Sequence, residues 1–168
     1  MTAPLVLTPL GLRQGGQCWP CTMGRGGISA AKREGDGATP AGEMRITGAL
    51  FRPDRMARPV PWARPIGPRD LWCDDPGHPL YNRPARAPLA ASAEALRRAD
   101  PLYDLILTTD WNEGGVPGRG SAIFVHRWRR PGAPTEGCIA LAPADLLAVA
   151  RAAPPGTRLL VPRGGAAP

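Results

Sequence analysis

Long hydrophobic runs are missing from this 168-residue sequence. No apolar stretch approaches the ~20 residues that a membrane-spanning helix needs, so we expect no membrane span. The first 14 residues, MTAPLVLTPLGLRQ, lack both a basic segment and a sustained apolar segment. Because a secretory signal combines those two features, the sequence as written carries no export signal.

Lysine and dense basic tracts are also scarce. Lys32 is the single lysine among 21 cationic side chains, and the formal net charge is +7. The arginines are scattered, the densest group being Arg127, Arg129 and Arg130, and no zinc finger, RNA-recognition signature or basic helix is visible. We therefore expect no nucleic-acid partner. Because the planar guanidinium binds carboxylates well, the composition favours a solvated basic surface with one carboxylate-binding patch.

Proline and glycine, by contrast, are abundant. The chain has 22 prolines and 21 glycines, yet 43% of its residues are hydrophobic, and Gly/Pro-rich pieces alternate with pieces rich in Val, Ile and Leu. This alternation predicts short strands and many turns rather than disorder. A chain of this length can bury a core without disulfides or metal, so we predict one domain over residues 1–168.

The apolar segments predict strands, and the Gly- and Pro-rich segments between them predict loops. Residues 24–44 are expected to form a loop, and residues 52–88 leave room only for loops and very short strands. The predicted strands are 3–13, 16–23, 44–51, 103–111, 121–128 and 157–162.

Two short helices are also predicted. SAEALRRA, from Ser92 to Ala99, has an N-cap serine and ends before Asp100-Pro101. A second helix should begin at Pro143, a residue that suits the first helical position. Its predicted buried face consists of Leu146, Val149, Ala150 and Ala153.

Cys18-Trp19-Pro20-Cys21 invites a redox interpretation. A thioredoxin-like site needs a helix directly after the motif to lower the thiol pKa, and the continuation TMGRGGIS cannot form one. Cys73 and His78 would complete four zinc ligands, but they lack finger-like spacing. We interpret Cys18 and Cys21 as packed strand cysteines, with a redox or zinc site as the alternative.

The segment PTEGCIALAP, residues 134–143, places Cys138 after a glycine and before an apolar run. A free cysteine is often simply a buried hydrophobic residue. However, Gly137 would let the backbone approach a substrate, and the N–H groups around Cys138 can face a developing oxyanion. The segment is therefore a candidate site for nucleophilic attack on an acyl carbon.

A thiol needs a base for such chemistry, and His126 is the candidate. Alternation along the strand predicted over 121–128 places His126 on one face with Ala122 and Phe124. The only other histidine, His78, lies in a loop between prolines. From the residues alone, a Cys–His acyl-transfer site and a core cysteine beside a core histidine are equal alternatives.

Several motifs together resemble the YkuD-type L,D-transpeptidases. GSAIFVH (120–126) followed by TEGCIAL (135–141) resembles the catalytic core of that family, in which a histidine precedes a Ser/Thr-His-Gly-Cys sequence. KREGDGATPAGEM (32–44) resembles the family's Lys-x-Gly-Asp-x-x-Thr-Pro-x-Gly stretch. LYNRP (80–84) and YDLILTTDWN (103–112) fit a small bacterial branch of it.

This resemblance implies a mostly β fold, a β-sandwich or partial barrel of mixed strands with one or two short helices, and no metal or organic cofactor. It implies that Cys138 is the nucleophile and His126 its base, that the N–H groups of Gly137 and Cys138 form the oxyanion hole, and that Thr135 shapes the loop. The implied partners are peptidoglycan stem peptides containing diaminopimelate, with carbapenem-type compounds as inhibitors. The implied location is the periplasm or cell envelope.

The implied reaction passes through a thioacyl enzyme that the side-chain amine of a neighbouring diaminopimelate resolves, giving a cross-link. Glu136 stands where the family usually has a second histidine, Ala140 where Arg or Asn is common, and the linker from His126 to Cys138 is short. The donor bond therefore stays open between 3-3 and 1-3 cross-links. With water as acceptor the enzyme would be an L,D-carboxypeptidase or endopeptidase, and the non-enzymatic alternative is a basic module that binds cell wall or nucleic acid.

Several further residues are candidates for holding the substrate. Arg119, Arg127 and Arg129 could bind stem-peptide carboxylates, although a solvated basic rim is the favoured explanation for each of them. Tyr81 and Asn112, together with their neighbours Asn82 and Trp111, are expected to line the cleft, with core and turn roles as the alternative. Asp110, Glu136 or a backbone carbonyl would orient the imidazole.

Overall fold

Fifteen strands and one helix make up the part of the chain that the computed structural model describes, residues 1–164. The prediction of a mostly β fold with mixed strands is confirmed. The strands are β1 (Leu5–Thr8), β2 (Gly11–Gln14), β3 (Gln17–Trp19), β4 (Cys21–Thr22), β5 (Ile28–Ser29), β6 (Thr39–Pro40), β7 (Gly42–Phe51), β8 (Ala63–Pro65), β9 (Asp70–Cys73), β10 (Arg83–Arg86), β11 (Ala93–Ala95), β12 (Leu105–Thr109), β13 (Val125–Arg127), β14 (Ile139–Leu141) and β15 (Arg158–Val161). The helix is α1 (Pro143–Ala152).

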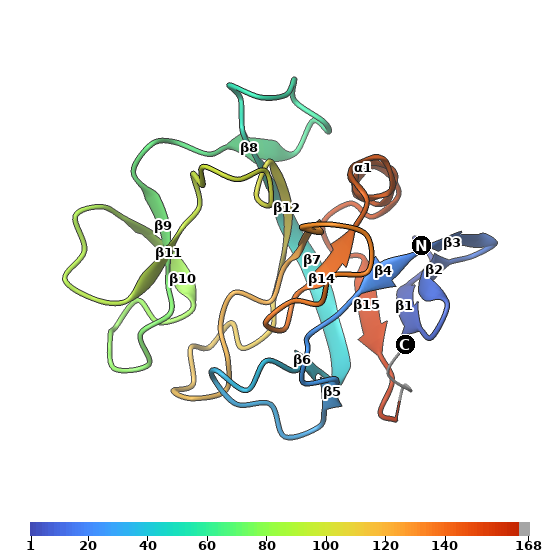
Figure 1. The fold of residues 1–168 in the computed structure, drawn as a ribbon, viewed down its shortest axis with the longest axis horizontal. Helices are drawn as coiled ribbons and strands as arrows, with labels where there is room; N and C mark the ends of the chain where they lie inside the picture. Colours follow the sequence, from blue (N-terminus) through green and yellow to red (C-terminus); the bar gives the residue numbers. More distant parts are fainter. Residues whose placement is uncertain (165–168) are drawn as a thin grey trace.

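Ten strands form one sheet in the order β3-β2-β1-β15-β7-β12-β13-β14-β4, with β8 paired to β7. The first and last strands of this order, β3 and β4, are neighbours in the chain, so the sheet curls into a nearly closed partial barrel (Figure 1). Its pairs are mixed: β12 and β13 are antiparallel, whereas β13 and β14 are parallel.

The long strand β7 shows how the sequence pattern produces this curvature. Met44 and Ile46 are buried, and after a register shift opposite Thr108 and Thr109 the buried positions become Ala49 and Phe51. A bulge of this kind changes which alternate residues face the core and increases the local twist. The bend of the sheet therefore requires the alternation of buried residues to shift by one position within MRITGALF.

Two apolar clusters lie on the two faces of this sheet. The first packs α1 against strand residues such as Leu107 and Ile139, and the second packs Ile106 and Phe124 against Trp72 of the three-stranded sheet β10-β9-β11. In Figure 1, α1 and this three-stranded sheet lie on opposite sides of β7 and β12. Fully burying one such side chain contributes about 1.5–3 kcal/mol.

The helix α1 agrees with its prediction. It begins at Pro143, and Leu146, Val149, Ala150 and Ala153 are all buried. With ten residues it is too short to cross a membrane, and no helix in the described part of the chain could do so.

The helix predicted from Ser92 to Ala99 is wrong. Residues 93–95 form β11, which pairs with β9 so that Glu94 lies opposite Trp72. Eight residues are too few for a stable helix without packing, and the ladder with β9 overrides their local helical preference.

Three other boundaries differ from the predictions. The strand expected over 3–13 is divided into β1 and β2 by a turn, and the loop expected over 24–44 contains the short parallel pair β5 and β6. The strand expected over 121–128 narrows to β13 because Ala122 has a φ of +52°, outside the β region. The predicted alternation holds nonetheless, since Ala122 and Phe124 pack in the second cluster and Val125 in the first.

Candidate active site

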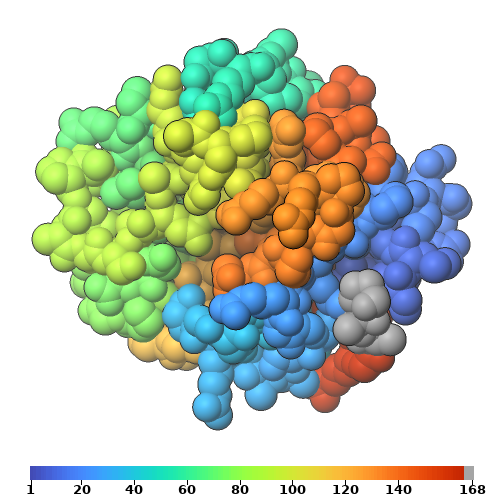
Figure 2. Space-filling model, viewed as in Figure 1, coloured from blue at the N-terminus to red at the C-terminus, as the bar shows by residue number. Residues whose placement is uncertain are grey.

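A cleft of about 520 Å³, called here the Cys138 cleft, contains both predicted catalytic residues. Figure 2 shows the orange segment around residues 130–140 at the surface, between the yellow-green segment near residue 100 and the blue segment near residue 25. The residues of the cleft that matter for its chemistry are Arg25, Glu94, Arg98, Tyr103, His126, Arg129, Glu136 and Cys138.

Cys138 lies just before β14 and is half-buried. Its thiol donates a hydrogen bond to the carbonyl oxygen of Ala122, with Sγ and O 3.1 Å apart, and accepts one from the N–H of Phe124 at 3.4 Å. Burial, reinforced by the charge of Glu94, raises the pKa of the thiol to about 12. At neutral pH the group is therefore an oriented thiol rather than a thiolate.

His126 lies on β13, and its side chain is buried. Its Nδ1 is 2.6 Å from the carbonyl oxygen of Arg127, which can only accept, so Nδ1 carries the hydrogen and Nε2 is left unprotonated. Burial lowers the imidazole pKa to about 4. Of the three predicted ways of orienting the ring, the structure uses the backbone carbonyl: Asp110 binds the N–H of Arg45, and Glu136 pairs with Arg25.

The parallel pairing of β13 with β14 brings the two groups to one face of the sheet. His126 lies opposite Ala140, and Cys138 is two residues earlier, so the side chains of Cys138 and His126 project from the same face. The ring of Tyr103 packs edge-on against the imidazole, with centroids 5.4 Å apart. This packing fixes the orientation of the imidazole ring.

A short loop in front of Cys138 is held by hydrogen bonds from Thr135. The Thr135 hydroxyl donates to the carbonyl of Cys138 at 2.6 Å and accepts the N–H of Gly137 at 3.1 Å. Gly137 has a φ of +143°, and a Cβ there would lie 2.8 Å from the carbonyl oxygen of Ala38. Only glycine fits this position, and the predicted loop-shaping role of Thr135 agrees with these contacts.

The segment KREGDGATPAG supports this loop from behind. The Asp36 carboxylate is paired with Lys32 and accepts the N–H of Ala38 at 2.9 Å. This turn places Thr39 so that its hydroxyl donates to the carbonyl of Gly137 at 2.8 Å and accepts the N–H of Gly24 at 2.9 Å. The segment therefore serves as a buttress for the loop that precedes Cys138.

The two N–H groups predicted for the oxyanion hole differ in availability. The N–H of Gly137 is already donated to Thr135, whereas the N–H of Cys138 has no acceptor among the described residues. Cys138 thus offers one free amide donor next to its own thiol.

The buried Asn82, which was expected to line the cleft, lies outside it and orients the carbonyl that accepts the thiol proton. Asn82 accepts the N–H of Ala122 and the indole N–H of Trp72, each at 3.0 Å, through one amide oxygen. Its amide nitrogen donates to the carbonyls of Trp111 and Asn112. Because this network holds Ala122 at a positive φ, it directs the Ala122 carbonyl toward Cys138.

The predicted substrate-binding residues are distributed over two places. Arg129 lines the Cys138 cleft, whereas Arg127 follows His126 on β13 and projects from the opposite face. The side chains or carbonyls of Tyr81, Asn112 and Arg119 gather around the loop that ends at Gly120. These three residues do not line the cleft, and in the described structure they order that loop.

Sequence reasoning missed Glu94 and Tyr103, which also line the cleft. The Tyr103 hydroxyl donates to the Glu94 carboxylate at 2.5 Å, and burial raises the pKa of each group. Glu94 was hidden by the wrong helix prediction over residues 92–99. Arg98 pairs with Asp100 at 2.6 Å and lies over the Tyr103 ring.

The Cys18-Cys21 motif lies outside the cleft. Cys18 is exposed on β3, and burial raises the pKa of the Cys21 thiol on β4 to about 12. No helix directly follows the motif, so it lacks the helix N-terminus that a thioredoxin-like site requires. Across residues 1–164, no group of three or more His, Cys, Asp or Glu side chains is arranged to hold a metal ion.

One cleft thus contains the Cys138 thiol and the buried His126 imidazole, with a loop before Cys138 that Thr135 and Thr39 hold by hydrogen bonds. The profile of the L,D-transpeptidase catalytic domain, YkuD, matches residues 12–161. The chain belongs to this family. Comparisons with curated proteins and with solved structures found no match.

The YkuD match spans all the parts of the site described above, from the buttress to the nucleophile loop. Membership makes the chain an L,D-transpeptidase-type catalytic domain, of a family that acts on peptidoglycan peptides and is generally found in the cell envelope.

Proposed function

We propose that this YkuD domain is a cysteine L,D-transpeptidase that cross-links peptidoglycan stem peptides through a thioacyl enzyme on Cys138. The observation that carries the proposal is that an oriented thiol and a buried histidine with an unprotonated Nε2 share one cleft. A core cysteine beside a core histidine would need neither the cleft nor a glycine-only loop in front of the thiol.

In the first half-reaction His126 takes the Sγ proton while the sulfur attacks a stem-peptide carbonyl carbon. A thiol pKa of about 12 and an imidazole pKa of about 4 disfavour a preformed thiolate–imidazolium pair, so the proton transfer accompanies the attack. The imidazolium then returns the proton to the leaving amine as the C–N bond breaks. The product is a thioester on Cys138.

The free N–H of Cys138 is the first donor to the developing oxyanion. The Gly137 N–H becomes a second donor when the Thr135 hydroxyl releases it, while Thr39 continues to hold the Gly137 carbonyl.

In the second half-reaction the side-chain amine of a neighbouring diaminopimelate attacks the thioester. We assign recognition of that amine to Glu94, because the other acid of the cleft, Glu136, is already paired with Arg25 at 2.9 Å. Tyr103 fixes the Glu94 carboxylate. Nε2 of His126 takes the proton that the amine loses, and returns it to sulfur as the C–S bond breaks.

The carboxylates of the stem peptides would bind the basic rim of the cleft. Arg129 and Arg130 line it, are exposed, and have no ion-pair partner among the described residues. Such a substrate lies in the periplasm, where we expect the protein to act. The carbonyl that reaches Cys138, from the third or the first stem residue, decides between 3-3 and 1-3 cross-links.

The decisive experiment incubates the purified protein with defined tetra- and pentapeptide muropeptides and identifies the products by mass spectrometry. We expect a cross-linked dimer with wild type and none with Cys138→Ala. The Cys18→Ala variant, which removes an exposed thiol outside the cleft, should retain full activity. Hydrolysed monomer without dimer would make the protein a hydrolase, and an inactive wild type would overturn the proposal.

A second experiment measures intact mass after incubation with a carbapenem. A single adduct should form on wild type and on Cys18→Ala, and none on Cys138→Ala. An adduct on Cys138→Ala would show that Cys138 is not the nucleophile.

The role of Glu94 is tested by the ratio of cross-linked to hydrolysed product. Glu94→Gln should raise the KM for the acceptor about tenfold, the effect of losing one charge-assisted hydrogen bond, while hydrolysis by water continues. Glu113→Gln, an exposed site outside the cleft, is the matched control. An unchanged acceptor KM would contradict the assignment.

A further inference from the structure

A second hollow, called here the arginine groove, lies between the large sheet and β10. Its volume is about 650 Å³, larger than that of the Cys138 cleft. Trp72 and Leu96 of the second apolar cluster border it, whereas Tyr103 of the same cluster borders the cleft. The cluster therefore separates the two hollows, and the groove has no part in the reaction described above.

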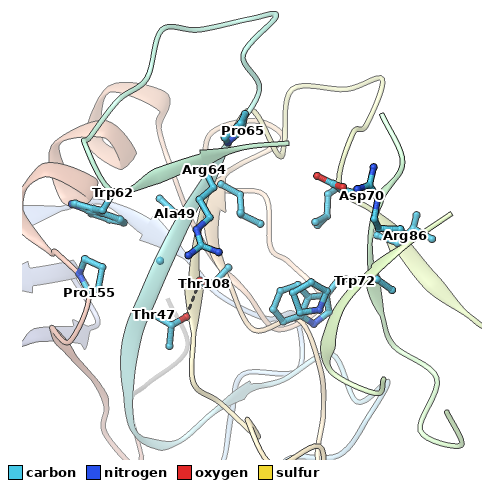
Figure 3. A pocket seen from close by; sticks show the side chains of 16 residues that line it. Thr47, Ala49, Trp62, Arg64, Pro65, Asp70, Trp72, Arg86, Thr108 and Pro155 are labelled. Atoms are coloured by element: carbon cyan, nitrogen blue, oxygen red, sulfur yellow. Dashed lines mark hydrogen bonds between the residues drawn. The ribbon is translucent and has the colours of Figure 1, made fainter. Parts of the chain in front are cut away.

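The floor of the groove is polar and its ends are aromatic. The hydroxyls of Thr47 on β7 and Thr108 on β12 are hydrogen-bonded at 2.8 Å, and the adjacent Gly48 adds no side chain above them. Trp62 and Trp72 lie toward opposite ends of the groove, with Arg64 between them (Figure 3).

The groove has a net positive charge, with Asp70 opposite Arg86 in the pairing of β9 with β10 as its counter-charge. Arg64 on β8 and Arg86 on β10 are exposed, and neither makes an ion pair or a side-chain hydrogen bond to another described residue. Asp70 is the one acid among the lining residues, and its carboxylate accepts the N–H of Gly67 at 2.7 Å. Two guanidinium groups in one concavity with a single acid, itself engaged, are complementary to an anionic ligand.

We propose that the arginine groove binds a second disaccharide–peptide unit of the peptidoglycan polymer, next to the unit that reacts at Cys138. This proposal rests on the proposed function, which makes that polymer the substrate. Indole faces pack against the C–H faces of sugar rings, and guanidinium groups bind stem-peptide carboxylates in a bidentate manner. The half-buried Trp62 and the exposed Arg64 and Arg86 offer both chemistries within one space.

A second site of this kind increases the effective concentration of the polymer at the catalytic cleft. The enzyme should therefore bind intact sacculi more tightly than soluble monomers, and the groove should matter only for the polymer.

The test compares two double variants in the Cys138→Ala background, so that binding is measured without reaction. Arg64→Glu/Arg86→Glu reverses the charge of the two groove arginines. Arg83→Glu/Arg151→Glu reverses the charge of two exposed arginines outside the groove. Both pairs lower the net charge equally, so any difference comes from position. Pelleting with purified sacculi should show about tenfold weaker binding for the groove variant than for the control.

The same two double variants, made with Cys138 intact, allow cross-linking to be measured as well as binding. Cross-linking of soluble muropeptides should be equal in both pairs, whereas cross-linking in sacculi should fall only in the groove variant. Equal sacculus binding by the two pairs would overturn the groove proposal and leave the proposed function intact. A wild type that neither reacts with muropeptides nor binds sacculi would overturn the proposed function itself.

Competition experiments, which also use a Trp62→Ala variant in the Cys138→Ala background, separate the contributions of the glycan and of the stem peptide to binding. Glycan strands stripped of peptide should compete for wild type better than for Trp62→Ala, and free stem peptides should compete less well for the Arg64→Glu/Arg86→Glu variant. If neither competitor distinguishes the variants, the proposed ligand is wrong.

Discussion

In the Cys138 cleft two of the four arginines are paired, Arg25 with Glu136 and Arg98 with Asp100, whereas in the arginine groove neither Arg64 nor Arg86 has an ion-pair partner among the described residues. The cleft also holds four titratable groups with pKa values shifted by burial, Cys138, His126, Tyr103 and Glu94. Chemistry requires groups that are oriented and desolvated, while recognition of a charged polymer requires charge that is still available.

The largest expected difference between the two hollows is in turnover. His126→Gln should reduce cross-linking of soluble muropeptides about 100- to 10,000-fold, because it removes the base that takes the thiol proton. The groove substitutions Arg64→Ala and Arg86→Ala should leave the same rate unchanged. His78→Gln, which removes the other histidine of the chain, is the control. A loss smaller than tenfold in His126→Gln would exclude His126 as the base.

The next largest expected effect is a loss of folding stability in acid, which depends on the buried imidazole of His126. Its pKa is about 4 in the folded protein against 6.5 ordinarily, so the unfolded chain binds its proton first as the pH falls. The contribution of the neutral His126 to the free energy of unfolding is fully present above pH 6.5. It is lost between pH 6.5 and 4, by about 3 kcal/mol in total.

Urea unfolding of wild type and His126→Gln over this pH range measures that contribution. Carboxylates affect both proteins, so the wild type should lose more stability than the variant by the stated amount. Parallel pH curves would show that His126 is not held neutral by burial.

A smaller effect is expected from the loop in front of the nucleophile. Gly137→Ala places a methyl group against the Ala38 carbonyl at a positive φ, which should lower the free energy of unfolding by about 1–3 kcal/mol and displace the thiol. Gly132→Ala, at φ +78° in open space on the same segment, is the control for backbone strain alone. Thermal unfolding and carbapenem acylation report the two effects, and equal results for both variants would show that contact with Ala38 is unimportant.

The sequence was sufficient for those parts of the site that local pattern determines. Strand alternation placed His126 on the same face as Phe124, and Pro143 marked the start of α1. Glu94 could not be found this way, because SAEALRRA has helical propensity and becomes a strand only through pairing with β9. The hydrogen bonds of Asn82 could not be predicted either, since they join residues 29 to 40 positions apart through one side chain.

The arginine groove illustrates the same limit. Its cations come from β8 and β10, which belong to different sheets, and nothing in the Pro- and Arg-rich segment 52–88 indicates that Arg64 and Arg86 face one space. Composition predicted a carboxylate-binding patch on a basic surface, but its position depends on how the three-stranded sheet packs against β7 and β12.

The smallest expected effect is the change in the free energy of unfolding when either groove arginine is removed. Exposed side chains without partners contribute little to folding, so Arg64→Ala and Arg86→Ala should each change the free energy of unfolding by less than about 0.5 kcal/mol. Arg52→Ala, which removes a buried guanidinium paired with Asp54, should cost several times more. Urea unfolding at pH 7.5 measures all three. A large loss at Arg64 or Arg86 would mean that these side chains support the fold, and would weaken the contrast between a cleft built for chemistry and a groove available for binding.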